Sequence, residues 1–349
     1  MRILPYLFIC LLALHGAVSS DSESQEDDDD YEEQDRPDQL VCGTSWNCTC
    51  TKEEDPTVIC DHARLKDSDT RLGTTYIGFP KDYKPKIVHM KDCDIKKLEK
   101  DRIVPSVAKQ LVELDLSSNS IDYIGKDAFK GMDHLAILRL SHNNIKKLHR
   151  NTFHDDLGFK LHRLFLDYND IENLPENAFE GLKELKMLVL DGNVFTQKLN
   201  KKMFAGLSNL ETLSLDYCGL DHDSLPFDAF DELINLKALS LRGNKFEKVP
   251  AAVNSINHLE ILDMSKTKVA EFGERSLKSD HKIKKLIMTD LPYMYFISNC
   301  AFCDLKNLER AIAFRSERIC FAVERHKRGT NVFLCPWLIC PTGQNIHFL

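Results

Sequence analysis

Leucine and related apolar residues recur along this chain in one pattern, LxxLxL followed by Asn and a further apolar residue. Between Leu111 and Ile145 the pattern appears twice, and the second copy is displaced by 24 residues. Self-similarity at a period of about 20–50 residues is typical of a solenoid. After a first strand around Val88 and Met90, repeats start at Leu111, Leu135, Leu161, Leu185, Leu210, Leu236, Leu259 and Ile283, and a degenerate last repeat starts at Leu308.

A second column of apolar residues supports this register. Phe153 lies eight residues before Leu161, which predicts a two-residue insertion near Gly158. Elsewhere the column lies six residues before the next repeat start, at Phe129, Phe179, Phe204, Phe230, Val253, Leu277 and Phe302. We expect this column to fill the core from the side opposite the strands.

Each LxxLxL segment predicts a short strand whose apolar side faces the core. The segments between the strands lack ten-residue helical patterns, so we expect turns, extended stretches and short 3-10 pieces there. About nine stacked coils would form an α/β solenoid, a horseshoe with a concave parallel β-sheet and a mostly irregular convex side.

Asparagine follows most of the strands, where its amide can satisfy backbone groups of the turn and of the neighbouring coil. The positions are Asn119, Asn143, Asn169, Asn193 and Asn244. Cys93 and Cys218 occupy the same column, and the repeat consensus permits Cys there. We therefore expect both to be buried, unpaired thiols.

The other cysteines gather at the two ends of the repeats. Four precede them (Cys42, Cys48, Cys50 and Cys60) and five follow (Cys300, Cys303, Cys320, Cys335 and Cys340). Both groups predict disulfide-stapled caps, at 42–84 and 311–349, around repeats spanning 85–310. The total is odd, so one of the last five is expected to be spare. Cys300 and Cys303 also have the spacing of a redox or zinc pair, but an oxidising compartment favours structural pairing.

The N-terminal region predicts secretion. Residues 1–20 have one early Arg, an apolar stretch over 3–14 and small residues before Asp21, the pattern of a signal peptide. We therefore expect an extracellular protein that does not insert into a membrane. Residues 21–41 contain 11 acidic residues and one Arg, although the whole chain has a net charge of −8. This predicts a disordered acidic arm on a nearly neutral body, and the arm would attract basic partners.

Three segments are candidates for modification. Tyr31 is surrounded by carboxylates, the context of tyrosine sulfation; alternatively the arm is a solvated tail that aids solubility. Asn47 opens a glycosylation sequon. Residues 325–328, RHKR, fit either a proprotein-convertase site or an exposed basic loop that binds polyanions.

The spacing C-x5-C-x-C-x9-C followed by these repeats resembles secreted extracellular leucine-rich-repeat proteins. The acidic, tyrosine-bearing arm makes the chain loosely similar to small leucine-rich proteoglycans and chondroadherin. This resemblance implies bridges Cys42–Cys50 and Cys48–Cys60, and binding of collagen, matrix components or growth factors. Two features depart from the proteoglycans: the chain has no Ser-Gly dipeptide, and its C-terminal cysteines do not match their extended cap.

The positions between the leucines point outward on the concave sheet, because strand side chains alternate. Asp167, Asp191 and Asp216 fall in one column on consecutive strands, roughly 5 Å apart, where their repulsion favours a cation or a basic ligand. Aromatic, apolar and Arg side chains surround them, as in a protein-binding hot spot. The predicted ligand-binding residues are Arg139, Phe165, Asp167, Tyr168, Val189, Asp191, Asp216, Tyr217 and Arg242. The alternative is that polar residues are ordinary in these slots and that water screens them.

The sequence contains no G-x-S-x-G, H-E-x-x-H or P-loop motif, so it predicts no enzyme, no cofactor and no nucleic-acid partner. We expect a matrix-associated scaffold that binds extracellular proteins on its concave face. The alternatives are a soluble modulator or decoy for a receptor, growth factor or immune factor, and an inhibitor of a secreted enzyme.

Overall fold

A computed structural model describes residues 48–60, 79–312 and 331–333, except 53, 81, 101, 103, 105–106, 151, 154, 274–275, 279–281, 299–300 and 303–304. The chain forms two compact units. The first comprises residues 1–145 and 151–161, and the second comprises residues 146–150 and 162–349. Each unit is described by itself.

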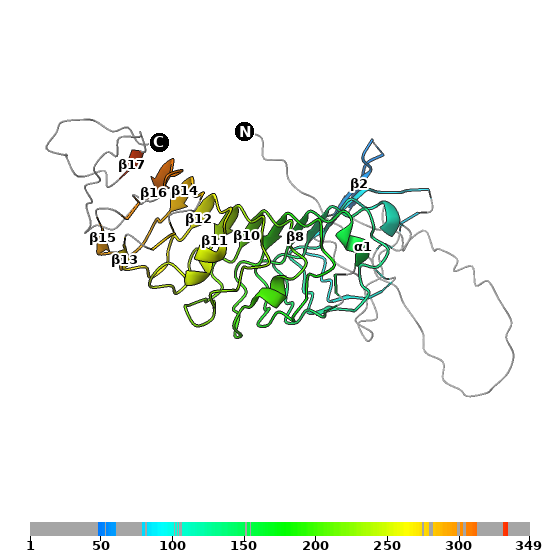
Figure 1. The fold of residues 1–349 in the computed structure, drawn as a ribbon. Coiled ribbons are helices and arrows are strands. Elements are labelled where there is room, and N and C mark those ends of the chain that lie inside the picture. The colour runs from blue at the N-terminus through cyan, green and yellow to red at the C-terminus, as the bar shows by residue number, and fades with distance from the viewer. Residues whose placement is uncertain are drawn as a thin grey trace. The chain divides into compact units, whose positions relative to one another are not determined.

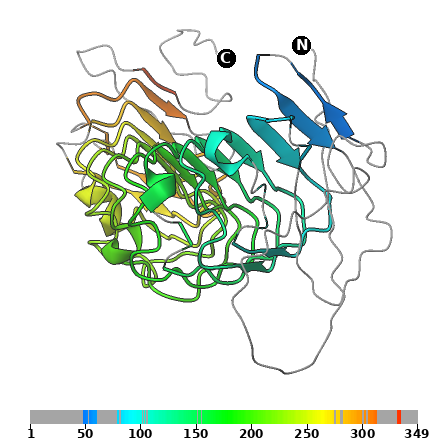
Figure 2. The same ribbon diagram turned by 90° about the vertical axis from the view of Figure 1, so that its right-hand side faces the viewer.

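The sheet of unit 1 begins with an antiparallel pair, β1 (Cys48–Cys50) and β2 (Thr57–Cys60), which Figure 2 shows in blue beside the next strand. It continues with parallel strands in chain order, β3 (Ile87–Met90), β5 (Glu113–Asp115) and β7 (Ile137–Arg139). A second sheet pairs β4 (Lys97–Leu98) with β6 (Tyr123–Ile124). The helical segments of this unit are η2 (Ala108–Gln110) and α1 (Asp155–Gly158).

Unit 2 repeats the same coil (Figure 1). Its parallel strands also follow chain order: β8 (Arg163–Phe165), β9 (Met187–Val189), β10 (Thr212–Ser214), β11 (Ala238–Ser240), β12 (Ile261–Asp263), β14 (Lys285–Ile287), β16 (Arg310–Ile312) and β17 (Asn331–Phe333). A small sheet pairs β13 (Glu271–Phe272) with β15 (Phe296–Ile297). The helical segments are η3 (Lys201–Phe204) and η4 (Ala251–Ser255), both of the 3-10 type.

The strand register confirms the predicted repeat. In unit 1 Val88 pairs with Leu114, and Leu114 pairs with Leu138. In unit 2 Leu188, Leu213 and Leu239 pair in the same way. Within each unit the central apolar residue of one strand therefore stacks on that of the next, which produces the predicted parallel solenoid.

The strands reach beyond the predicted repeats. Val58 of β2 pairs with Val88, so the N-terminal cysteine segment contributes a strand of its own to the sheet of unit 1. In the described ranges, α-helix is confined to the four residues of α1, as expected if the segments between the strands are mostly irregular.

The core has the two predicted layers. The strand leucines are fully buried, and so are Phe129, Phe179, Phe204 and Phe230 on the opposite side of the coil. Neighbouring rings of this column lie in contact. The ring centroids of Phe204 and Phe230 are 6.0 Å apart, and those of Phe129 and Phe153 are 6.2 Å apart. Burial of a large apolar side chain stabilises a fold by about 1.5–3 kcal/mol, so these layers supply most of the driving force.

The asparagine column links consecutive coils. Asn193 is fully buried; its side-chain amide donates to the carbonyl oxygens of Leu166 (3.0 Å) and Leu190 (2.8 Å), and its Oδ1 accepts from the Ile171 N–H (3.1 Å). Asn244 repeats this arrangement with the carbonyl oxygens of Leu215 and Leu241. One side chain thus satisfies backbone groups of two coils, as predicted.

The two cysteines of this column differ. Cys218 is buried and free, as predicted, and burial raises the pKa of its thiol, which makes it a poor nucleophile. The prediction for Cys93 is wrong, because Cys93 is disulfide-bonded. A position in the column shows that a side chain is buried but not which other cysteine lies within reach.

Cys48 and Cys50 are also disulfide-bonded, and the register places Cys48 opposite Cys60. Cys42 and the side chain of Cys60 lie outside the described residues, so the pairings Cys42–Cys50 and Cys48–Cys60 stay predictions. Several other predictions fall on undescribed residues: the signal peptide (1–20), the acidic arm with Tyr31 (21–41), Asn47, Cys300, Cys303, Cys320, Cys335, Cys340 and residues 325–328.

Asn193→Ala should lower the free energy of unfolding by about 1–3 kcal/mol, because it leaves the buried Ile171 N–H without an acceptor. The Leu166 and Leu190 carbonyl oxygens each lose one donor but keep another, from Asn169 and Cys218 respectively. Urea unfolding followed by circular dichroism measures the change. The matched control is Asn209→Ala, which removes an exposed hydrogen bond to the Lys183 carbonyl and should cost no more than about 0.5 kcal/mol. Equal losses in the two variants would contradict the role assigned to the buried amide.

Candidate ligand-binding face

The outward-pointing side chains of β8 to β12 and of β14, with the residues that follow each of these strands, form a surface that we call the open sheet face. Phe165 and Val189 lie side by side in the strand register, and both are half-buried. On β10 and β11 the equivalent positions are Ser214 and Ser240. The face therefore changes from apolar to hydroxyl-bearing along the unit.

Two of the predicted aspartates are bonded to the backbone of the next coil. The Asp216 N–H donates to Asp191 Oδ1 at 2.8 Å, and the Arg242 N–H donates to Asp216 Oδ1 at 2.8 Å. The hydroxyl of Ser240 also donates to Asp216 Oδ1. The column that begins at Asp167 is thus a set of hydrogen bonds between coils as well as a row of charges.

These contacts show how the structure accommodates neighbouring carboxylates. Burial raises the pKa of Asp191, and the nearby Asp167 carboxylate raises it further, whereas hydrogen bonds from Ser214 and the Asp216 N–H lower it. For Asp216 burial is again the largest cause, and the pKa rises to about 6 although Ser240 and the Arg242 N–H favour the ionised form. Asp216 therefore titrates in a mildly acidic range, and its proton limits the repulsion within the column.

Tyrosine and glycine alternate in the next column. Tyr168 and Tyr217 adopt left-handed backbone angles, with φ of 52° and 55°, as do Gly192 and Gly243 with φ of 70° each. A Cβ on Gly192 would lie 2.7 Å from Tyr168 Cδ1, and a Cβ on Gly243 would overlap Tyr217 Cδ1. Each ring therefore lies across the glycine of the following coil, a space that any other residue would occupy.

The two tyrosines remain accessible, with 48% of Tyr168 and 40% of Tyr217 exposed. Arg242 Nε donates to the Tyr217 hydroxyl oxygen at 3.2 Å. This hydrogen bond, with a smaller contribution from the Lys266 side chain, holds the pKa of Tyr217 below its usual value. Tyr217, Arg242 and Lys266 thus form a polar cluster on the open sheet face, after β10, β11 and β12.

One edge of the face carries alternating charges on successive coils. Lys237 Nζ lies 2.8 Å from Glu211 Oε2, and Lys284 Nζ lies 2.8 Å from Glu260 Oε2. All four side chains are substantially exposed, so each pair contributes little, about 0–1 kcal/mol. The charges of these four side chains are thus paired with one another within the protein.

Arg139 belongs to unit 1 and is described apart from the other predicted residues. Its Nη1 donates to Glu113 Oε1 at 2.7 Å, and His89 Nε2 lies 3.1 Å from the same oxygen. The predicted residues of unit 2, from Phe165 to Arg242, do occupy one sheet face.

The sequence interpretation missed the residues that complete this face, namely Ser214, Ser240, Gly192, Gly243 and Lys266. Two signals were available for some of them. The serines lie two positions before Asp216 and Arg242, and the glycines alternate with the tyrosines in one column. The sequence gives no sign that Lys266 belongs to this face, because the position of a lysine does not show that its side chain reaches Tyr217, two coils earlier.

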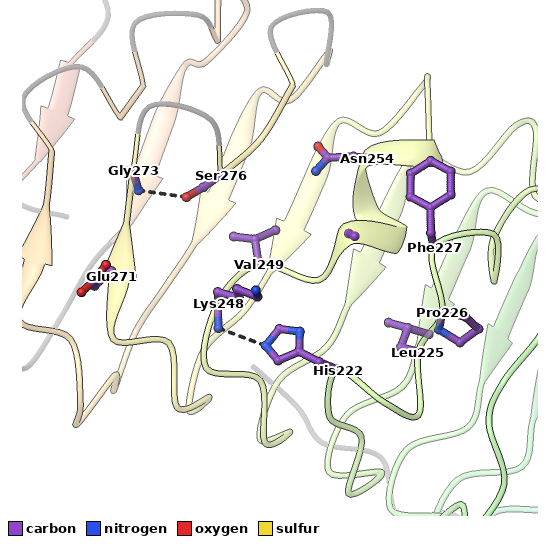
Figure 3. Close-up of a pocket in the computed structure, with 11 residues that line it drawn as sticks. His222, Leu225, Pro226, Phe227, Lys248, Val249, Asn254, Glu271, Gly273 and Ser276 are labelled. Carbon is purple, nitrogen blue, oxygen red and sulfur yellow. Dashed lines mark hydrogen bonds between the residues drawn. The ribbon is translucent and has the colours of Figure 1, made fainter.

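A groove of about 680 Å³ lies among the turns that follow β10, β11 and β12 (Figure 3). Its apolar floor includes Leu225 and Val249, and the His222 ring accepts a hydrogen bond from the Lys248 N–H at 3.3 Å. Figure 3 shows Glu271 and Phe227 at opposite ends of the groove, so its functional groups do not converge on one point.

Within the described ranges, no three His, Cys, Asp or Glu side chains are grouped so that they could hold a metal ion. None of the helices there is long and apolar enough to cross a membrane.

Comparison with protein families accounts for the repeats. A family model described as Leucine rich repeat matches residues 109–155 and 159–220, and one described as BspA type Leucine rich repeat region, with six copies, matches residues 196–309. This chain is a leucine-rich-repeat protein. No curated protein sequence matches it.

Solved structures of the same fold include two of the Toll–Spatzle complex, a molecular hub in Drosophila development and innate immunity, one of them in a glycosylated form. The TM-score is 0.55 for both, and the sequence identities are 17% and 16%. The matches cover 76% and 78% of this leucine-rich-repeat chain, but only 44% and 45% of the neighbours. The chain thus spans less than half the length of these neighbours, and the likeness concerns the fold alone.

Asp216 should make the stability of this leucine-rich-repeat protein depend on pH. Its folded pKa of about 6 lies above the ordinary 3.8, so the folded state holds the proton more tightly, and stability falls as pH rises through this window. Asp216→Asn keeps an acceptor oxygen but cannot ionise. Relative to wild type, the variant should therefore gain stability between pH 4 and pH 6, as measured by urea unfolding at each pH.

The control is Asp170→Asn, which replaces an exposed carboxylate beside the face and should leave this pH dependence in place. A difference between wild type and Asp216→Asn that stays constant from pH 4 to pH 7 would contradict the prediction.

Proposed function

We propose that this leucine-rich-repeat protein is a secreted, non-enzymatic scaffold that binds a protein partner through the open sheet face of unit 2. The observation that carries the proposal is the arrangement of that face. The exposed rings of Tyr168 and Tyr217 flank the Asp191 and Asp216 carboxylates, with Phe165 and Val189 on the adjacent column. Aromatic side chains around a partly desolvated polar centre are the usual composition of an interface hot spot.

The rigidity of this face supports the proposal. The Tyr168 and Tyr217 rings lie against Gly192 and Gly243, and the carboxylates are bonded to the next coil. Side chains that are already ordered lose less conformational entropy when a partner binds. A preformed surface of this kind favours protein binding over a merely solvated sheet.

The fold comparison supports the same class of function. Leucine-rich-repeat folds typically serve as non-enzymatic interaction scaffolds, and the Toll structures are complexes with Spatzle. What carries over to this chain is that a solenoid of this type can hold a protein ligand.

The proposed compartment is extracellular. It is supported by the signal-like residues 1–20 and by the disulfide bonds of Cys48, Cys50 and Cys93, since disulfides persist mainly in oxidising compartments. We place the protein in the matrix in preference to free solution, because the acidic segment 21–41 would attract basic matrix components.

The double variant Phe165→Ala, Tyr168→Ala should weaken capture of the partner at least about tenfold, because hot-spot side chains contribute on the order of 2 kcal/mol or more each. The protein would be incubated with extracellular extract, its partners identified by mass spectrometry, and their affinity measured with the purified components. The matched control is Phe227→Ala, which removes an aromatic side chain, 57% exposed, from the turns outside the face. Undiminished capture by the double variant would refute the assigned face.

Removal of residues 2–20 should retain the protein inside expressing cells, whereas the full chain should reach the medium or the cell-layer matrix. Immunoblots of lysate, matrix and medium separate these outcomes. Recovery of the full chain only from the medium would favour a soluble modulator over a matrix scaffold. Equal secretion of both chains would contradict the proposed signal.

A further inference from the structure

We propose that Tyr217, Arg242 and Lys266 form a recognition site for an oxyanion, the carboxylate or sulfate group of an acidic side chain on the protein partner. This inference rests on the proposed function and names the chemistry that the partner must present to the open sheet face after β10, β11 and β12.

The three side chains come from consecutive coils and meet because of the backbone. Tyr217 leaves the chain at a left-handed residue, and its ring crosses the next coil over Gly243. This path brings the hydroxyl to Arg242, whose Nε donates to it at 3.2 Å. Lys266 is also left-handed, with φ of 55°, and its ammonium approaches the same hydroxyl from the third coil.

These groups present hydrogen-bond donors that the described part of the protein leaves without acceptors. Because Arg242 donates to its oxygen and Lys266 approaches the same oxygen, the Tyr217 hydroxyl keeps its proton for a further acceptor. Among the described residues, the terminal nitrogens of Arg242 have no hydrogen-bond or ion-pair partner either. A guanidinium, an ammonium and a phenol gathered in one cluster can together match the several lone pairs of an oxyanion.

The nearest carboxylates do not fill this role. Asp216 Oδ1 is bonded to the Ser240 hydroxyl and to the Arg242 N–H, and Asp263 Oδ1 accepts from the Ser265 N–H at 2.8 Å. Both influence Arg242 electrostatically, but among the described residues neither forms an ion pair with its guanidinium. By contrast, the lysines at the edge of the face are paired with Glu211 and Glu260. Arg242 and Lys266 thus lie beside the neutral Tyr217 hydroxyl, and among the described residues neither has a carboxylate partner. An external anion could therefore pair with both cations.

The test uses the full chain labelled with 13C at tyrosine Cζ, whose NMR signal reports both the ionisation and the surroundings of each phenol. The Tyr217 signal is assigned by comparison with Tyr217→Phe. Two probes distinguish the sources of the anion: the peptides acetyl-Gly-Glu-Gly-amide and acetyl-Gly-sulfotyrosine-Gly-amide, each at constant ionic strength. We expect a saturable shift of the Tyr217 signal with at least one probe. Its apparent pKa should rise by about half a unit, because a nearby negative charge disfavours the phenolate.

Arg242→Gln and Lys266→Gln should each weaken the response at least fivefold. Lys245→Gln is the matched control, because it removes the same charge from a neighbouring turn and should leave the response unchanged. A response to the sulfated peptide alone would assign the site to sulfate esters, and a response to the glutamate peptide alone would assign it to carboxylates. No saturable shift with either probe, or equal weakening by Lys245→Gln, would overturn the proposal.

The two proposals fail in different ways. Partner capture that survives without any anion response at Tyr217 would leave the protein-binding face standing and remove the oxyanion site. An anion response with no partner captured would show a working site on a face whose proposed function is wrong.

Discussion

The buried asparagine that follows most of the strands is the interaction on which the rest of this structure depends. Every coil turns sharply after its strand and leaves backbone N–H and C=O groups inside the protein, where unmatched polar groups are costly. Asn193 and Asn244 satisfy these groups on their own coil and on the preceding one. Because one amide serves two coils, it sets the register between them, and the leucine and phenylalanine layers then stack without an offset.

The same turn determines what the open sheet face can present. In each coil one residue after the strand must adopt a left-handed conformation, and Tyr168, Gly192, Tyr217 and Gly243 do so in succession. Glycine adopts this conformation without strain, whereas tyrosine does so at a cost. The cost is offset by the contact of each ring with the adjacent glycine, which also gives the rings a defined direction.

Those parts of the fold that recur at each period could be predicted from the sequence, because a core position must be filled in every coil. The strand leucines, the asparagines and the column of Phe179 and Phe204 are of this kind. The state of Cys93 could not be predicted, since its column shows burial but not which other cysteine lies near. The face was predicted as a set of residues, but its contacts were not. The bond from Ser240 to Asp216 and the approach of Lys266 to Tyr217 join residues of different coils whose exact spacing varies.

The hydrogen bonds of the aspartate column connect molecular recognition to the mechanics of the solenoid. Asp191 and Asp216 face outward, where a partner would meet them, and each also holds the backbone of the following coil. A ligand that neutralises these carboxylates relieves their mutual repulsion and leaves the hydrogen bonds between the coils intact. Part of the binding free energy therefore stabilises the stacking of the coils. Occupancy of the face is therefore thermodynamically linked to the stiffness of the array, and resistance of these coils to unfolding would report whether the surface is occupied.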